Sequence, residues 1–355
     1  MISLAEVLAR HWPAYERAHG AKILPSHRRA VQAIRACRTP ALGGQKWRCE
    51  DGHVHLAFHS CNHRSCPQCG YLEADAWIAR HGQRLLPGVP YFLLTFTVPA
   101  QLRPLFYGQQ KKLYNLLLRE SAAAVQDLCA QPKYLGGEAG LLAVLHTWSR
   151  PLAYHPHVHV VVPGGGLTPE GGWSRVRDPE FFLHYQALSR CFRNRFERAL
   201  KQEHPQLYAQ APVRVWHRDW VVHLQAVGQG EAALKYLARY VYRTALGKER
   251  ILSDQDGRIA FNYRRSSDGQ LRRCELPADQ FITRILQHTL PKGFQRVRYY
   301  GWLSPAAKAK LERIRTLLDW RRAEPIAAKP RPECKCPECG KVMVLIGRFQ
   351  RGPPA

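Results

Sequence analysis

Hydrophobic and polar positions alternate in a way that predicts three β-strands before the middle of the chain. Residues 91–99 form an apolar run ended by a proline, and residues 141–148 form a second run. In residues 154–163, histidines alternate with other side chains before three consecutive valines. Successive side chains of a strand point to opposite faces, so His157 and His159 share one face and Val158 turns into the core. A short polar link joins the last two strands, which we therefore expect to pair as antiparallel neighbours.

Amphipathic spacing predicts helices around these strands. The helical stretches are 2–18, 26–36, 71–86, 109–130, 179–202, 231–246, 281–290 and 305–322. Residues 212–216 and 220–225 are expected as further strands, and residues 250–275 as a basic hairpin region with Asp-Gly turns. The fold class predicted from this pattern is α+β, with an antiparallel sheet and helices.

The charge of the chain indicates a polyanionic partner. Its 355 residues carry a formal charge of +26, and 39 of the 53 basic residues are arginine. Arginine binds phosphate bidentately and stacks on bases, so this bias favours nucleic acid over an anionic membrane. No apolar run approaches a membrane span and the first residues do not resemble a signal peptide, so we expect a cytoplasmic protein. No phosphate-binding loop motif is present, which argues against an ATPase or helicase.

Eleven cysteines are concentrated in two places, which favours metal binding in a cytoplasmic chain. The spacing Cys66-x-x-Cys69, with proline inside and glycine after it, is typical of a zinc knuckle. We expect a structural zinc ion whose other ligands come from Cys37, Cys49, His53, His55 or Cys61, with Cys49 and Cys61 favoured and His53 as the substitute. A second group, residues 334–339, forms half a zinc ribbon, and a complete site there would need a ligand from elsewhere in the chain.

Three histidines are candidates for a catalytic metal. His157 and His159 lie side by side on a predicted strand, and His146 on the neighbouring strand could face the same site. Three protein ligands leave positions open for a substrate. The alternative is a half-buried strand whose histidines are structural.

Basic and aromatic residues in the second half are candidates for contacts with nucleic acid. Tyr236 and Tyr240 are four residues apart on a predicted helix and share one face, which is also the usual spacing of a packed core pair. Lys235, Arg239 and Arg243 surround them, and residues 291–301 interleave basic and aromatic side chains.

These stretches, taken in order, resemble the rolling-circle transposases of bacterial insertion sequences, the two-tyrosine branch of the HUH endonuclease superfamily. The His-hydrophobic-His signature corresponds to residues 157–159, and Tyr236 to Tyr240 resembles the Tyr-x-x-x-Tyr motif. Residues 92–97, 290–294 and 298–301 are similar to further family motifs, and the N-terminal cysteines to its zinc-binding domain. One departure is Gly52, which stands where the family usually has the second cysteine of a pair.

The resemblance implies an antiparallel-sheet HUH nuclease core preceded by a small zinc-binding module. The expected regions are 1–80 (helices and zinc module), 81–250 (catalytic domain), 251–330 (basic region) and 331–355 (cysteine-rich tail). The implied enzyme nicks and rejoins single-stranded DNA at element ends and target through a 5′-phosphotyrosine, without ATP. The implied residues are Tyr236, Tyr240, Lys235 and Arg239 for catalysis; His157, His159 and His146 for Mg²⁺ or Mn²⁺; Cys49, Cys61, Cys66, Cys69 and His53 for zinc; and Arg193, Arg243, Lys292, Arg296 and Arg298 for DNA.

Three alternatives stay open, as does the oligomeric state. A plasmid or phage replication initiator, or a relaxase, would use the same chemistry in another role. A non-catalytic zinc protein would bind nucleic acid without needing either tyrosine. A metal-dependent hydrolase would use water and form no covalent adduct with DNA.

Overall fold

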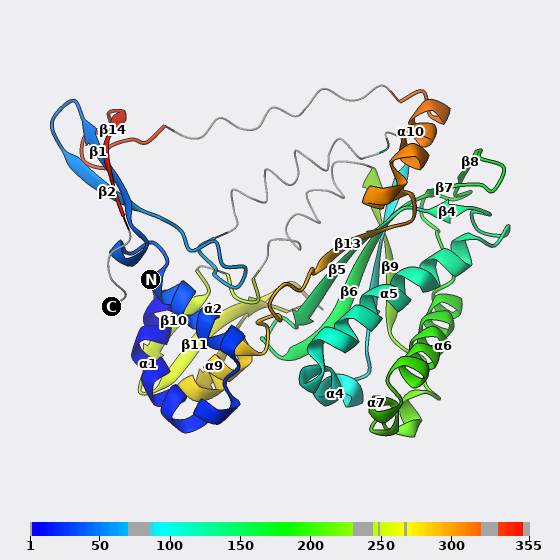
Figure 1. The fold of residues 1–355 in the computed structure, drawn as a ribbon, viewed down its shortest axis with the longest axis horizontal. Helices are drawn as coiled ribbons and strands as arrows, with labels where there is room; N and C mark the ends of the chain where they lie inside the picture. Colours follow the sequence, from blue (N-terminus) through cyan, green and yellow to red (C-terminus); the bar gives the residue numbers. More distant parts are fainter. Residues whose placement is uncertain are drawn as a thin grey trace.

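A five-stranded antiparallel sheet lies at the centre of the computed structural model (Figure 1), which describes residues 2–69, 86, 88–229, 244–247, 249–265, 268–320 and 333–350. The strand order is β13-β5-β6-β3-β9. The bounds are β3 (Pro90–Thr97), β5 (Leu141–Trp148), β6 (Tyr154–Pro163), β9 (Val222–Gln229) and β13 (Val297–Tyr300). The α+β class with antiparallel sheets is confirmed, and β5 and β6 pair as predicted.

The two faces of this sheet differ in chemistry. Phe92, Leu94, Val158 and Val160 point to one face and belong to the main hydrophobic core. Helices α5 (Gln110–Cys129) and α6 (Tyr185–Glu203) cover this face and add apolar side chains to the core (Figure 1). Because side chains alternate along a strand, the residues between them, His159 among them, point to the opposite face.

A second core joins the N-terminal helices to residues far along the chain. Helices α1 (Leu4–His19), α2 (Pro25–Ala36) and α9 (Ala278–Leu286) pack with the sheet of β10 (Ile251–Gln255), β11 (Arg258–Arg264) and β12 (Leu271–Pro277). The buried carboxylate of Asp254 accepts a hydrogen bond from Arg10 and contacts the Nε2 of His11, each at 2.7 Å. Segments that the sequence analysis assigned to different regions, 1–80 and 251–330, therefore share one core.

A strand near the C-terminal end of the described chain pairs with an early hairpin. β1 (Gly44–Cys49) pairs with β2 (Val54–Phe58) on one side and with β14 (Met343–Phe349) on the other (Figure 1). The described part of the cysteine-rich tail, residues 333–350, thus contributes a strand to the N-terminal sheet.

The remaining described elements are shorter. They are α4 (Arg103–Gly108), α7 (Pro205–Ala209), α10 (Lys308–Leu317) and a small sheet of β4 (Glu138–Ala139), β7 (Gly165–Leu167) and β8 (Trp173–Arg175). The strand predicted at 212–216 is wrong: Val213–Val215 form a 3-10 turn, in which the Val215 amide donates to the Pro212 carbonyl at 3.0 Å and the Trp216 amide to the Val213 carbonyl at 3.1 Å. The helices predicted at 71–86 and 231–246 fall almost wholly outside the described residues. None of the described helices is long and apolar enough to cross a membrane.

Candidate metal centre

Three imidazoles converge on the sheet face that α5 and α6 do not cover. His146 on β5 lies directly opposite His157 on β6, and His159 follows two residues along the same strand. The ring centroids of His159 are 4.8 Å from those of both His146 and His157. One nitrogen from each ring lies within 4.8 Å of the others, so the three donors can reach one metal ion.

Hydrogen bonds and burial give these rings the orientation and the neutral charge that metal binding requires. The Nδ1 of His157 donates to the backbone carbonyl of His155 at 2.7 Å, which leaves the Nε2 lone pair available. The Nδ1 of His159 lies 3.0 Å from the hydroxyl oxygen of Thr95. Burial lowers the pKa of His157 to about 4 and holds the pKa of His159 well below its usual value. Both rings are therefore neutral at pH 7, the form that binds metal.

The structure adds neighbours of the triad that the sequence analysis did not single out. Trp148 stacks on His146 with ring centroids 4.7 Å apart. Arg103 donates to the Nδ1 of His155 at 2.7 Å, and the His155 ring lies 5.1 Å from that of His157. Arg103 and His155 line a hollow of about 370 Å³ together with Arg214 and Arg218. In the sequence these three arginines look like the other 36, so no local signal distinguishes them.

The predicted nucleophiles and the basic residues around them fall in one segment of the sequence. Tyr236, Tyr240, Lys235, Arg239 and Arg243 all lie outside the described residues. The two described positions that flank this segment are Gln229, at the end of β9, and Thr244.

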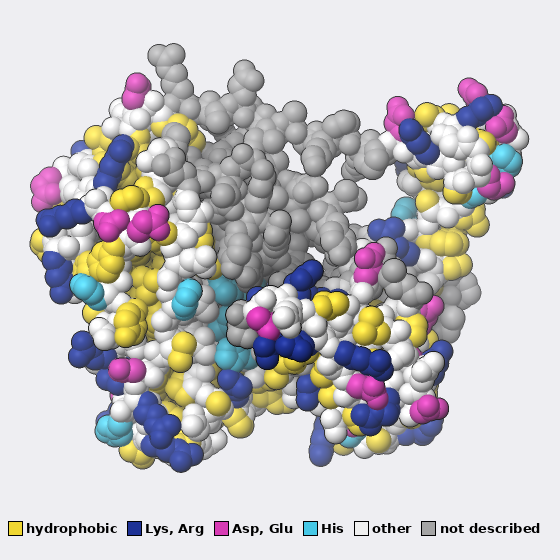
Figure 2. Space-filling model, turned by 180° about the vertical axis from the view of Figure 1, so that it is seen from behind, with side chains coloured by type: hydrophobic (Ala, Val, Ile, Leu, Met, Phe, Trp, Pro, Cys, Tyr) yellow, Lys and Arg dark blue, Asp and Glu magenta, His cyan; other side chains and the backbone are white. Residues whose placement is uncertain are grey.

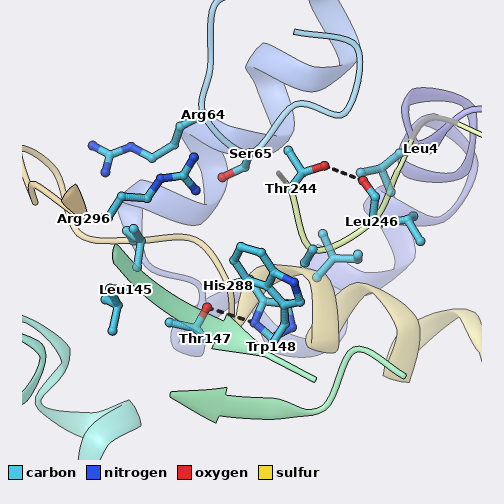
Figure 3. Close-up of a pocket in the computed structure, with 13 residues that line it drawn as sticks. Leu4, Arg64, Ser65, Leu145, Thr147, Trp148, Thr244, Leu246, His288 and Arg296 are labelled. Carbon is cyan, nitrogen blue, oxygen red and sulfur yellow. Dashed lines mark hydrogen bonds between the residues drawn. The ribbon is translucent and has the colours of Figure 1, made fainter. Parts of the chain in front are cut away.

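The predicted DNA-binding residues occupy different parts of the molecule. Arg193 lies on α6, the helix-covered side of the sheet, and donates to the Arg218 carbonyl at 3.0 Å. Lys292 is exposed in the turn before β13, and Arg298 lies on β13. Arg296 lines a pocket with Arg64, whose side chain lies beside it (Figure 3). Figure 2 shows histidines gathered near the middle of one face, with Lys and Arg side chains beside them.

The predicted zinc ligands separate into two clusters. Cys61, Cys66 and Cys69 meet with Cys37, while Cys49 and His53 meet with Cys336 and Cys339. The Sγ of Cys69 lies 3.6 Å from that of Cys37 and 3.5 Å from that of Cys61. The expected single site combining Cys49 with Cys66 and Cys69 is therefore not what the structure forms.

Local structure explains this division. Cys37 caps the end of α2, and Cys61 follows β2, so the β1–β2 hairpin between them carries Cys49 and His53 away from the knuckle. Hydrogen bonding from Cys66 lowers the pKa of Cys61 to about 5, so the four-cysteine cluster already favours a thiolate, the form that binds zinc.

Comparison with known proteins gives matches to the N-terminal region and to the middle of the chain. A family model described as "Putative transposase" matches residues 140–310, and one described as "Transposase zinc-binding domain" matches residues 7–98. The chain is 34% identical to "Putative transposase y4qJ" of Sinorhizobium fredii, over 99% of this chain and 92% of that protein. It is 30% identical to the "Transposase for insertion sequence element IS801" of Pseudomonas savastanoi pv. phaseolicola, over 77% of this chain and 69% of that protein. No solved structure gives a significant match.

Identity along almost the whole length of a relative defines the class: this protein is a transposase with an N-terminal zinc-binding domain. Within that class, the chain belongs to the IS91/IS801 family of rolling-circle, two-tyrosine HUH transposases. The resemblance stated from the motifs is confirmed.

Proposed function

We propose that this transposase nicks and rejoins single-stranded DNA through a 5′-phosphotyrosine intermediate. The observation that carries the proposal is the set of three imidazoles on one sheet face, at least two of them held neutral by burial. His146, His157 and His159 would hold Mg²⁺ or Mn²⁺, which when bound withdraws charge from the scissile phosphate. Three ligands from the protein leave coordination positions for phosphate oxygens.

The nucleophile in this proposal is the hydroxyl of Tyr236 or Tyr240. The tyrosine oxygen bonds to phosphorus, the bond from phosphorus to the 3′ oxygen breaks, and the tyrosine proton ends on the released 3′ hydroxyl. An unperturbed tyrosine pKa is about 10, so nearby positive charge from Lys235 or Arg239 would favour the phenolate. The reverse reaction rejoins the strand, and no ATP is consumed because the phosphotyrosine keeps the phosphodiester bond energy.

Few residues of sequence separate one proposed nucleophile from a described residue near this metal centre. Thr244 lines a pocket together with Trp148, the residue that stacks on His146 (Figure 3). Tyr240 precedes Thr244 by four residues, and four residues of extended chain cover at most about 14 Å.

The hollow lined by arginines is a suitable binding surface for the phosphates of the DNA strand. Arg214 and Arg218 are exposed and share this hollow with Arg103 and His155, next to the triad. Guanidinium groups bind phosphate oxygens in a sequence-independent manner, so the hollow is suited to hold a strand at the scissile position.

Membership in a transposase family favours DNA transposition over a replication initiator or relaxase with the same chemistry. Excision of a flanked element in cells separates these roles, because an initiator or relaxase would not move the element.

A labelled single-stranded oligonucleotide incubated with the protein and Mn²⁺ tests the chemistry. We expect a protein–DNA band that survives denaturation and disappears when Tyr236→Phe and Tyr240→Phe are combined. Cleaved DNA without an adduct would instead identify a hydrolase that uses water. Binding without cleavage, unchanged by the double substitution, would identify a non-catalytic DNA-binding protein.

A further inference from the structure

The C-terminal tail brings two cysteines to the N-terminal hairpin. β14 pairs antiparallel with β1, with Met343 opposite Cys49, so the turn that precedes β14 lies beside the β1–β2 turn. Figure 1 shows β14, from the end of the chain, against β1 and β2 from its beginning. Some 290 residues of sequence separate the two turns that meet here.

Each turn is closed by backbone hydrogen bonds. In the β1–β2 turn, the Gly52 amide donates to the Cys49 carbonyl at 3.0 Å, and Gly52 has φ of +85°. In the C-terminal turn, the Gly340 amide donates to the Cys336 carbonyl at 2.8 Å, and Gly340 has φ of +74°. Glycine adopts this backbone conformation without strain, so each turn can close tightly next to its two donor residues.

The four donor atoms have the spacing of a tetrahedral zinc site. The Nδ1 of His53 lies 3.5 Å from the Sγ of Cys49 and 3.7 Å from that of Cys336. The Sγ atoms of Cys49 and Cys339 are 3.6 Å apart. Zinc bonds of about 2.3 Å to sulfur and about 2.0 Å to nitrogen imply edges of about 3.8 Å between sulfurs and about 3.5 Å between sulfur and nitrogen.

A carboxylate lies behind the histidine in a supporting position. Glu338 is 3.5 Å from the Nε2 of His53 and 3.1 Å from the Nε2 of His55. A carboxylate on Nε2 favours the tautomer that leaves the Nδ1 lone pair for a metal, as is common behind zinc-bound histidines.

The small sheet has too few buried apolar side chains to explain its own folding. The buried residues of its cluster, among those described, are Cys49, Cys336 and Met343. Val344 is 62% exposed and Leu56 is 53% exposed. A module with so small a core depends on a cross-link, and four convergent metal donors supply one.

We propose that Cys49, His53, Cys336 and Cys339 bind a second structural zinc ion that fastens the C-terminal tail to the N-terminal hairpin. This site is separate from the four-cysteine cluster of Cys37, and two of its ligands lie far beyond the 7–98 match to the zinc-binding domain. The proposal does not depend on the DNA chemistry proposed above.

Metal analysis of the purified full-length protein tests the site. We expect the Cys336→Ser/Cys339→Ser variant to contain one zinc equivalent per chain fewer than the wild type. Cys334→Ser, a cysteine of the same tail outside the donor set, is the matched control and should lose none. An equal zinc content in the double variant and the wild type would overturn the proposal, as would a Cys49–Cys339 disulfide in protein purified under reducing conditions.

A second variant is expected to keep the metal. Its test is therefore valid even if the tail does not fold without metal. His53→Cys should retain the zinc equivalent, and after cobalt substitution its thiolate-to-metal absorption should exceed that of the wild type by about one part in seven, for eight thiolates instead of seven. An unchanged cobalt spectrum in a fully loaded His53→Cys protein would exclude His53 as a ligand.

Discussion

The same strands carry apolar side chains on one face of the central sheet and imidazoles on the other. On the side of α5 and α6, Val158 and Val160 are fully buried in an apolar core. On the other side, His159 is buried and His157 is partly exposed, and both present polar donor atoms to one another. The difference shows that a rigid sheet can hold reactive groups in place because its other face supplies the stability.

Substituting neighbours on β6 should separate the two faces most clearly. His157→Gln removes one proposed metal ligand, and we expect strand cleavage to fall about 10³-fold or more while the unfolding midpoint changes little. Val158→Ala removes two buried methyl groups, and we expect it to lower the free energy of unfolding by about 2 kcal/mol. Oligonucleotide cleavage and chemical denaturation measure both effects. Equal loss of stability in the two variants would contradict the proposed division of roles.

Acid should destabilise the protein by protonating buried histidines on and near this face of the sheet. Burial lowers the pKa of His288, which contacts Trp148, to about 4, as it does for His157. The unfolded chain, with a pKa near about 6.5, binds these protons more readily, so stability is full above about pH 6.5 and falls as the pH drops towards 4.

We expect each of these histidines to lower the free energy of unfolding by on the order of 2 kcal/mol at pH 5, compared with pH 7. Denaturation of metal-free protein at pH 7 and pH 5 measures the loss. His288→Gln cannot titrate and should show a smaller difference between the two pH values. The same pH dependence in this variant and the wild type would exclude a contribution from His288.

The hydrogen bond behind His159 should tune the metal site more gently. Thr95→Val removes the hydroxyl 3.0 Å from the Nδ1 of His159, and we expect Mn²⁺ to bind about tenfold more weakly. Titration calorimetry measures this change. Thr289→Val is the control, because the Thr289 hydroxyl is buried with no hydrogen-bond partner among the described residues. Weakening of equal size in the control would show that Thr95 acts only through packing.

The smallest expected difference is between substitutions of single arginines on the two sides of the sheet. Arg214→Ala, in the hollow beside the triad, should weaken binding of single-stranded DNA several-fold and reduce the salt slope by about 0.7. Arg198→Ala, on the exposed surface of α6, should leave both nearly unchanged. Fluorescence anisotropy over a range of salt concentrations measures the slopes. If the Arg198 variant loses as much as the Arg214 variant, the DNA does not follow the histidine side alone.

The sequence by itself determined the parts of this protein that depend on local periodicity. Alternation along residues 154–163 was enough to put His157 and His159 on one face and Val158 on the other, and the short link to residues 141–148 was enough to add His146. These conclusions needed only the geometry of one strand and its nearest neighbour in the chain.

Tertiary structure alone decided which distant donors share a site. Cys37 replaces Cys49 beside the zinc knuckle, and Cys336 and Cys339 join Cys49 from the other end of the chain. Arg103 reaches His155 in the same way, from an adjoining element rather than from the strand itself. Which of several chemically identical cysteines or arginines meet is set by how helices and sheets pack, and that depends on contacts across the whole chain rather than on spacing within one segment.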